Sequence, residues 1–361
     1  MKDYDIAVLP GDGIGTEVTA AALALLRALE PRLARRFVTT VHPAGAAHYR
    51  DHGVALPEPV LAACRRADAI LFGAMGLPDV RGPDGTEVIP QLDLRFALDL
   101  YAGVRPIRTW PGLPVPLADP RAAAIDLVLV RESTEGLFHA RGRGRREGHG
   151  SDEAVLDTMR ISRHGTARVC DFAFALARER RARGRPGRVT NVDKANVFES
   201  MAFWRQVFGE RAAAHPDIAA EHAYVDAMAL NLVMKPWQYD VLVTENMYGD
   251  ILSDLIAALV GGMGMAPSAD IGDAHALFQP AHGTAPDIAG RGIANPSAML
   301  LSAAMMLRWL GRRDGDAALG DAADAVESAL QRAFAEGAVR PHDFGGTSDT
   351  AAITRAVLER L

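Results

Sequence analysis

The sequence has few of the features that mark specialised classes of protein. Two cysteines, Cys64 and Cys170, form neither a disulfide framework nor a metal-ligand spacing, which suggests a reducing compartment. The formal net charge of −6 gives no reason to expect broad binding to nucleic acid. No apolar run is long enough to span a membrane, because Asp254 and three glycines interrupt the segment 251–266. The first residues, MKDYDIAVLPGDGIG, do not have the pattern of a signal peptide. We therefore expect a soluble, cytoplasmic protein that binds neither nucleic acid nor membrane.

The residues that are present indicate an α/β chain. Apolar residues make up 49% of the sequence and charged residues 23%, as in ordinary globular proteins. Strand-like runs such as AILFGA, IDLVLVRE and YDVLVTEN alternate with helical patterns at 17–30, 57–66, 153–181 and 296–335. This alternation predicts a sheet with crossover helices.

A Gly-rich loop, PGDGIGTEV, follows the first predicted strand. Its glycines are Gly11, Gly13 and Gly15, which is not the spacing G-x-G-x-x-G of a dinucleotide-binding turn. The loop therefore predicts a tight turn that needs positive φ, and it does not predict a Rossmann fold.

The stretch YGDILSDL places two carboxylates, Asp250 and Asp254, four residues apart. Apolar residues around them recur at helical spacing, so both carboxylates lie on one face of a predicted helix. One aspartate near a helix start can be a simple cap, but two like charges at i and i+4 destabilise a helix unless a cation lies between them. The pair is therefore a candidate site for a hard cation, which takes carboxylate oxygens.

Three arginines lie at the ends of predicted elements. Arg95 is in a helical segment, Arg105 follows in an extended Val-Arg-Pro, and Arg131 ends the apolar strand LVLV. Any one of them alone is an ordinary surface charge. Together they could clamp a di- or tricarboxylate, because guanidinium groups match carboxylates in paired geometry.

Two further segments place a charged residue next to apolar ones. Lys194 in NVDKANV lies between a strand and a helix start, where it is either a surface lysine or a general base. Asp226 in YVDAMALNLV begins another predicted helix, so capping competes with metal binding as its role.

The stretch HGTAPDIAGRGIANP, residues 282–296, is rich in glycine and proline, and a long ordered loop of this kind is usually functional. His282 and Asn295 could bind an adenine, and Asp287 could accept hydrogen bonds from two ribose hydroxyls. Because that carboxylate would repel a 2′-phosphate, the loop favours NAD over NADP.

Taken together, these motifs resemble those of the β-decarboxylating dehydrogenases, a family of 3-isopropylmalate, isocitrate, homoisocitrate and tartrate/D-malate dehydrogenases. The resemblance extends from LPGDGIG to LSAAMML, and its most specific parts are NMYGDILSDL, GGMGMAPSADIG and HGTAPDIAGRGIANP. It implies a two-domain α/β fold that is not a Rossmann fold. Residues 1–100 and 260–361 would form a large cofactor-binding domain, and 101–259 a smaller domain for dimerisation and substrate binding, with an arm near 139–150.

The resemblance also implies roles for individual residues. The catalytic residues would be Lys194 and Asp226, both of which reach into the site of the partner subunit of a homodimer. The metal, Mg²⁺ or Mn²⁺, would be bound by Asp226, Asp250 and Asp254. A small polycarboxylate substrate would contact Arg95, Arg105, Arg131, Phe138 and Gln91. The cofactor NAD would be bound by His282, Gly283, Thr284, Ala285, Asp287, Ile288 and Asn295.

The implied reaction is the oxidation of a 2-hydroxy acid followed by loss of its 3-carboxylate as CO₂. Four positions depart from common family patterns, namely Thr16, Asp193, Gln279 and Phe138. Gln279 replaces a glutamate that is often found before the loop, and Phe138 replaces a tyrosine expected to act in catalysis. Oxidation without efficient decarboxylation is therefore an alternative, because a phenyl ring carries no transferable proton.

The stretch before Arg95 leaves the substrate open between 3-isopropylmalate-like and tartrate/D-malate-like compounds. Ile89 stands where isocitrate dehydrogenases typically have serine, which disfavours isocitrate, and Gln91 and Leu92 stand where isopropylmalate enzymes typically show leucines. An alternative of another class is a non-catalytic NAD-binding regulatory subunit, which would have lost residues of the site.

Overall fold

The computed structural model describes residues 2–361, which separate into two compact units. The large unit contains the chain up to Leu100 together with Thr109–Ala118 and Ala257–Leu361, and the middle unit contains Tyr101–Arg108 and Asp119–Ile256. Within the described part of the chain, no helix combines the length and the hydropathy that crossing a bilayer requires.

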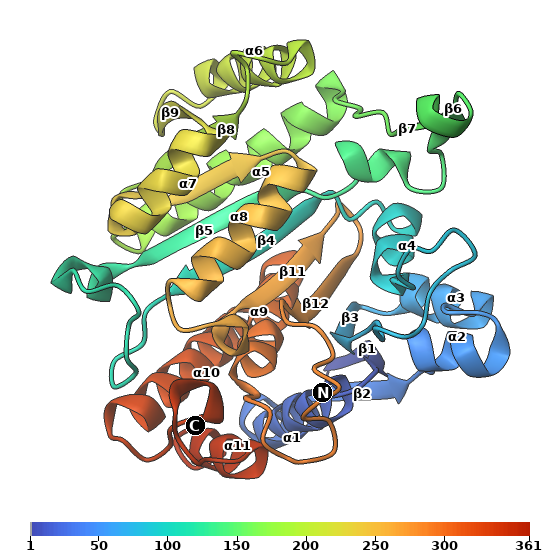
Figure 1. The fold of residues 1–361 in the computed structure, drawn as a ribbon. Helices are drawn as coiled ribbons and strands as arrows, with labels where there is room; N and C mark the ends of the chain where they lie inside the picture. Colours follow the sequence, from blue (N-terminus) through green and yellow to red (C-terminus); the bar gives the residue numbers. More distant parts are fainter. Residues whose placement is uncertain (1) are drawn as a thin grey trace. The chain divides into compact units, whose positions relative to one another are not determined.

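The sheet of the large unit has the strand order β2-β1-β3-β12-β11 (Figure 1). Its strands are β1 (Lys2–Gly11), β2 (Arg35–Val41), β3 (Ala69–Ala74), β11 (Pro267–Ile271) and β12 (Ala276–Pro280). The first four strands in this order are parallel to one another, whereas β11 pairs antiparallel with β12 as a hairpin. The order differs from the 3-2-1-4-5-6 order of a Rossmann sheet.

The helices of the large unit are α1 (Gly15–Leu33), α2 (Ala46–His52), α3 (Glu58–Arg66), α4 (Pro90–Ala97), α9 (Ser297–Asp314), α10 (Ala317–Ala335) and α11 (Thr350–Leu358). The strands of this unit are buried on both sides because helices cover both faces. On one face, α1 and α9 pack against β3, β11 and β12. On the other face, Val60 and Cys64 of α3 and Leu94 of α4 join a cluster with Ile70 and Phe72 of β3.

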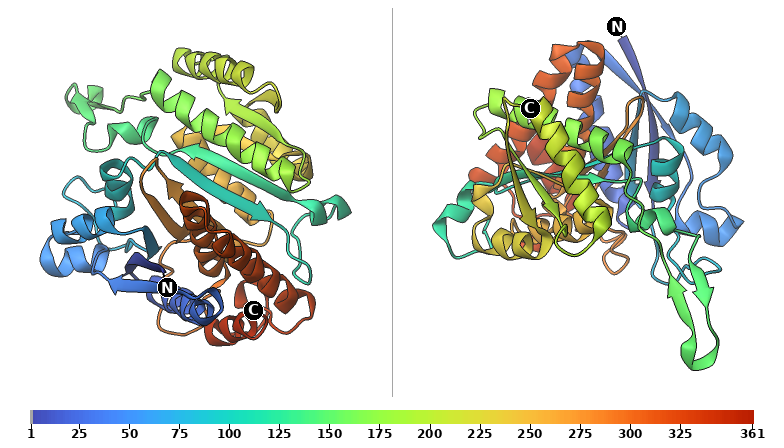
Figure 2. Two further views of the ribbon diagram at one scale, coloured as in Figure 1. Left: turned by 180° about the vertical axis from the view of Figure 1, so that it is seen from behind. Right: turned by 90° about the horizontal axis from the view of Figure 1, so that it is seen from above.

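The strands of the middle unit follow one another in the order β4-β5-β10-β8-β9. Its strands are β4 (Ala102–Arg108), β5 (Asp126–Glu132), β8 (Arg188–Asp193), β9 (Ala219–Tyr224) and β10 (Val241–Thr244). All neighbours are parallel except β4 and β5. Its helices are α5 (Arg163–Ala182), α6 (Glu199–Ala214), α7 (Val225–Met234) and α8 (Asn246–Ala258). Figures 1 and 2 show α5 on one face of these strands and α7 and α8 on the other.

A hairpin projects from the middle unit (Figure 2). It is formed by β6 (Arg145–Glu147) and β7 (Ala154–Leu156), which pair antiparallel. The helical pattern predicted over 153–181 was therefore wrong in its first ten residues. Helix α5 begins at Arg163 because the Ser162 side chain caps it, accepting a hydrogen bond from the backbone N–H of Gly165.

The Gly-rich loop is the tight turn that the sequence predicts. Gly11 and Gly13 have φ values of 75° and 54°, a region that residues with a Cβ rarely adopt. A Cβ on Gly13 would lie 2.1 Å from the carbonyl oxygen of Thr284. The turn therefore packs directly against the loop that begins at His282, and the backbone N–H of Ile14 donates to the same carbonyl at 2.9 Å.

Candidate active site

In the middle unit, most of the predicted site residues follow the carboxyl ends of parallel strands. Arg131 is near the end of β5, Lys194 directly follows β8, Asp226 comes shortly after β9, and Asp250 lies on α8 just after β10. Carboxyl ends of parallel strands meet at one edge of a sheet, where side chains from segments distant in sequence come together.

Arg131 is held in a buried network that points its guanidinium at α8. The side chain is 2% exposed. Its Nε and Nη2 donate to Asn246 Oδ1 at 2.8 and 2.5 Å, and its Nη1 donates to the Asp250 carboxylate. Asn246 is fixed in turn, since its Nδ2 donates to the Glu135 carbonyl at 3.0 Å. Gly249 makes the close approach possible, because a Cβ there would lie 2.6 Å from Arg131 Cγ.

Asp250 and Asp254 lie on one face of α8, as the sequence predicts, because the helix runs from Asn246 to Ala258. Burial raises the pKa of Asp254, the negative charge of Asp250 raises it further, and Arg105 and Arg131 partly oppose the shift. The Asp250 side chain remains 54% exposed. Two carboxylates that repel each other and retain access to solvent are a suitable donor set for a cation.

The Phe138 ring lies against the Arg131 guanidinium, with the guanidinium carbon 4.8 Å from the ring centroid. An aromatic face attracts a cation, so this contact helps to hold Arg131 in place. The next residue, His139, has its Nε2 2.8 Å from Arg143 Nη1, and burial together with Arg143 and Arg160 lowers its pKa.

Lys194 and Asp226 form an ion pair across two strands. Lys194 Nζ lies 2.7 Å from Asp226 Oδ1. The pairing follows from the register, because Asp193 of β8 lies opposite Tyr224 of β9 and the two residues leave neighbouring strand ends. The hydrogen bond from Lys194 lowers the pKa of Asp226, whose side chain is 68% exposed.

The three predicted metal ligands do not converge within one chain. Within residues 2–361, no three His, Cys, Asp or Glu side chains are grouped closely enough to bind a metal. Asp250 and Asp254 are neighbours on α8, whereas Asp226 is occupied by Lys194 at the end of β9.

Sequence reasoning missed a set of buried glutamates beside Arg131. Glu132 is 1% exposed and accepts hydrogen bonds from Thr134 N, Thr134 Oγ1 and Glu135 N. Burial raises the pKa of Glu132 to about 7, although these hydrogen bonds lower it. Glu245 is fully buried, and burial raises its pKa too. The available signal was position, because Glu132 is the last residue of a buried strand and Glu245 directly follows another.

In the large unit, α4 carries Arg95 and Gln91 on one face, since they are four residues apart. Arg95 is buried, and its Nε lies 3.1 Å from Asp270 Oδ2. Gln91 Oε1 is buried and accepts no hydrogen bond from any described residue.

The loop after β12 presents several of the predicted cofactor residues. Thr284 is anchored, since its Oγ1 donates to the Gly76 carbonyl at 2.7 Å. Ala285 has a positive φ of 38°, which makes it a strained turn position, and Asp287 is exposed. His282 Nε2 is buried without a hydrogen-bond partner among the described residues, and burial lowers the pKa of this imidazole. An unsatisfied polar nitrogen in such a loop fits a bound polar group.

The side chain of Asn295, which the sequence predicts to bind an adenine, already has hydrogen-bond partners within the protein. Its Oδ1 accepts a hydrogen bond from Ser297 N at 3.0 Å, and its Nδ2 donates to Asp343 at 3.1 Å. Both polar atoms of the side chain are thus bonded within the protein, and its binding of an adenine stays a prediction. Asp343, which the sequence did not single out, holds this asparagine.

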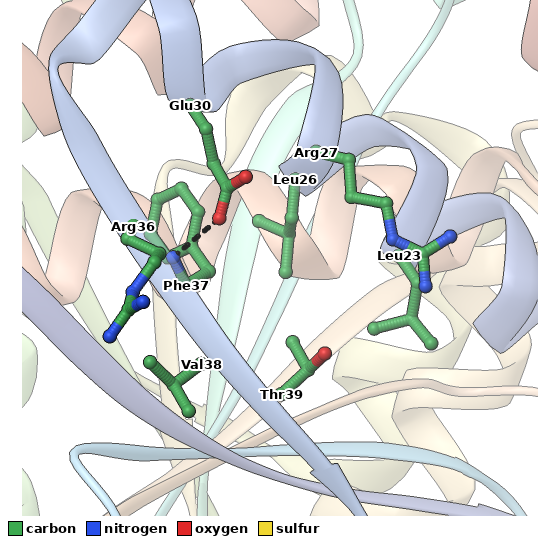
Figure 3. Close-up of a pocket in the computed structure, with 8 residues that line it drawn as sticks. All are labelled: Leu23, Leu26, Arg27, Glu30, Arg36, Phe37, Val38 and Thr39. Atoms are coloured by element: carbon green, nitrogen blue, oxygen red, sulfur yellow. Dashed lines mark hydrogen bonds between the residues drawn. The ribbon is translucent and has the colours of Figure 1, made fainter.

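Figure 3 shows a depression between α1 and β2 that is separate from all of these residues. Its mouth carries Arg27, Glu30 and Arg36, and Glu30 accepts a hydrogen bond from Phe37 N at 2.8 Å. None of the candidate site residues lines it, so it is not a candidate for the active site.

Comparison with known proteins assigns the family. A family model described as isocitrate/isopropylmalate dehydrogenase matches residues 5–360. The chain belongs to the isocitrate/isopropylmalate dehydrogenase family. A 3-isopropylmalate dehydrogenase from Yersinia pestis is 41% identical over 355 residues, which cover 96% of this chain and 93% of the relative. One from Moorella thermoacetica is 40% identical over 370 residues, covering 99% of each chain.

A solved structure agrees with this assignment. The crystal structure of isocitrate dehydrogenase from Methylococcus capsulatus has a TM-score of 0.86 at 35% identity and covers 99% of both chains. The family resemblance and the α/β fold class predicted from the motifs are therefore confirmed. In common with other members of the isocitrate/isopropylmalate dehydrogenase family, the chain is an oxidoreductase that acts on the CH–OH group of a hydroxy acid.

Proposed function

We propose that this protein is an NAD- and divalent-metal-dependent dehydrogenase of a 2-hydroxy di- or tricarboxylate, with β-decarboxylation of the product. The substrate would be 3-isopropylmalate-like or tartrate/D-malate-like. The observation that carries the proposal is the grouping of Arg131 with Asp250 and Asp254. A guanidinium beside two carboxylates can bind an anionic substrate and a cation next to each other.

The middle unit supplies the groups that would act on the hydroxyl. Asp250 and Asp254 would bind Mg²⁺ or Mn²⁺, which when bound would polarise the substrate hydroxyl. Arg131 would bind a substrate carboxylate, as would Arg105 and Arg95. Asp226 would leave its ion pair with Lys194 and bind the metal. Lys194 would then take the hydroxyl proton, directly or through water.

The loop after β12 would bind NAD, which accepts the hydride. His282 fits this role because its Nε2 is unsatisfied, and Gly283 leaves its surroundings open, with no atom within 4 Å of a Cβ built there. Asp287 has no ion-pair or hydrogen-bond partner among residues 2–361, so its carboxylate is free to accept hydrogen bonds from ribose hydroxyls. The same carboxylate would repel a 2′-phosphate, so NAD is preferred over NADP.

A homodimer with shared active sites is part of the proposal. Helix α7 exposes Leu230, Val233 and Met234, with relative exposures of 64%, 44% and 64%. Asp226, Leu230 and Met234 are spaced by four residues and lie on one face of α7. A second copy that covered this apolar stripe would bring Asp226 to the interface, where it could complete the metal ligands of the partner. The exposed Val155 and Leu156 of the hairpin are a second apolar surface for such contacts. A cytoplasmic location stays a prediction from the sequence.

The test is a substrate panel on the protein purified alone. D- and L-malate, the tartrates, 3-isopropylmalate, isocitrate and homoisocitrate are offered with Mn²⁺ and NAD, and NADH formation is recorded. We expect turnover of a 3-alkylmalate or of a tartrate/malate, and loss of turnover in Lys194→Ala. A protein that binds NAD but oxidises none of these compounds would instead be the non-catalytic subunit.

A further inference from the structure

Arg95 is a buried cation with one counter-ion in its own unit. The Arg95 side chain is 5% exposed and the Asp270 side chain is 1% exposed, and Nε lies 3.1 Å from Oδ2. No other carboxylate within residues 2–361 forms an ion pair with this arginine. Removing one partner of a buried pair leaves an uncompensated charge, which is strongly unfavourable. Asp270 therefore keeps Arg95 inside the fold.

The contact also orients the guanidinium. Asp270 lies against the Nε edge of Arg95. Nε makes no hydrogen bond with any described residue, so Asp270 holds this edge of the guanidinium by charge attraction. The terminal nitrogens of the planar guanidinium remain for a second carboxylate. This is the arrangement expected of an arginine whose inner side is held by the protein and whose outer side binds a ligand.

Gln279 holds Asp270 in this position. Its Nε2 donates to the same oxygen, Asp270 Oδ2, at 2.9 Å, and Gln279 is 7% exposed. The contact follows from the β11–β12 register, in which Ser268 lies opposite Gln279. Asp270 is two residues beyond Ser268 and shares its face of the hairpin, so it is the diagonal neighbour of Gln279.

The glutamine at 279 adds no charge beside Asp270. A glutamate at 279 would place two carboxyl groups at hydrogen-bond distance, where like charges repel. It would also give the pocket of Arg95 an excess negative charge, which opposes an anionic ligand. The aspartate and the glutamine are therefore compatible only as a pair.

We propose that Asp270 and Gln279 are the positioning residues of Arg95, with the one carboxylate that faces this arginine at position 270 and a neutral amide at position 279. The inference rests on the proposed function only in taking the ligand of Arg95 to be a substrate carboxylate. The pair sets how strongly Arg95 binds that carboxylate, without touching the reacting atoms.

The experiment is a four-member cycle consisting of wild type, Asp270→Asn, Gln279→Glu and the double variant. Each single change should raise the substrate KM by about tenfold or more while kcat changes less, because binding of a carboxylate is weakened. The double variant moves the charge across the hairpin to position 279 and keeps one carboxylate beside Arg95, so its KM should return to within about threefold of wild type. The KM for NAD should stay constant throughout.

A matched control is Asp240→Asn, which breaks another buried pair, Arg180–Asp240, whose Nε–Oδ1 distance is 2.6 Å. Asp240 directly precedes β10, away from the strand end that carries the site. This variant should lower the melting temperature and leave the substrate KM unchanged. A double variant of 270 and 279 that is no better than the worse single variant would overturn the inference.

Melting temperatures separate this inference from the proposed function. Each single variant should melt below wild type, and the double variant should recover, whether or not a substrate is found. If wild type oxidises nothing in the panel but the melting temperatures recover, the proposed function fails and the pairing stands. If wild type is active and neither KM nor melting temperature recovers, the pairing fails and the function stands.

Discussion

Glu132 should make the stability of this protein depend on pH. It is 1% exposed, and burial raises its pKa to about 7 from an ordinary value of 4.5. The folded state therefore binds the proton more tightly than the unfolded state, so the stabilisation is complete below pH 4.5. It is lost as the pH rises through 7. At about 1.4 kcal/mol for each unit of pKa, the difference between 4.5 and 7 amounts to about 3.5 kcal/mol.

The perturbation is Glu132→Gln, which keeps the shape and removes the titrating group. Free energies of unfolding are measured by urea denaturation from pH 5 to pH 8, at one protein concentration. Relative to the variant, wild type should lose about 2–3 kcal/mol over this range. A constant difference in the free energy of unfolding between the two proteins does not affect the result. The quantity compared is how steeply that free energy changes with pH.

The control is Glu359→Gln, since Glu359 is exposed at the end of α11. The free energy of unfolding of this variant should change with pH in parallel with that of wild type. Parallel profiles for wild type and Glu132→Gln would refute the reasoning, because they would mean that Glu132 has the same pKa in the folded and unfolded states.

Four further outcomes follow from the site. A chelator should abolish turnover, and Asp250→Asn should weaken metal binding measured by titration calorimetry, because it removes one charge from an all-oxygen site; full activity in chelator would rule out the metal. The ratio of kcat/KM for NAD to that for NADP should exceed one and fall in Asp287→Asn, since the carboxylate opposes a 2′-phosphate. Phe138→Tyr should raise the CO₂:NADH ratio or the decarboxylation rate, because a positioned general acid is worth about 10²–10⁴ in rate; one CO₂ per NADH in wild type, with no gain from tyrosine, would contradict this. Gly136→Ala should lower the melting temperature, because its φ is 69° and the new Cβ would lie 2.6 Å from Glu245 Oε2; the matched Gly142→Ala, with φ 69° and open surroundings, should cost less.

The features that the sequence determines by itself are local ones. The placement of Asp250 and Asp254 on one helical face follows from their spacing, and α8 confirms the helix. The tight turn at Gly11 and Gly13 follows from glycines at positions of positive φ. The alternation of strands and helices likewise predicts the α/β class, because periodicity is a property of neighbouring residues.

The features that only tertiary structure decides are the partners of the charged groups. Arg131 pairs with Asp250 across 119 residues, and Arg95 finds its counter-ion on another element, at Asp270. The Lys194–Asp226 pair depends on β8 and β9 being neighbours in register. The position of Glu132 at the end of an apolar strand is visible in the sequence, but only the fold shows that it is buried deeply enough to raise its pKa. The physical reason is common to all of these cases. Strand order and register bring segments together irrespective of their separation in sequence, and the strength of a charge interaction depends on the burial that results.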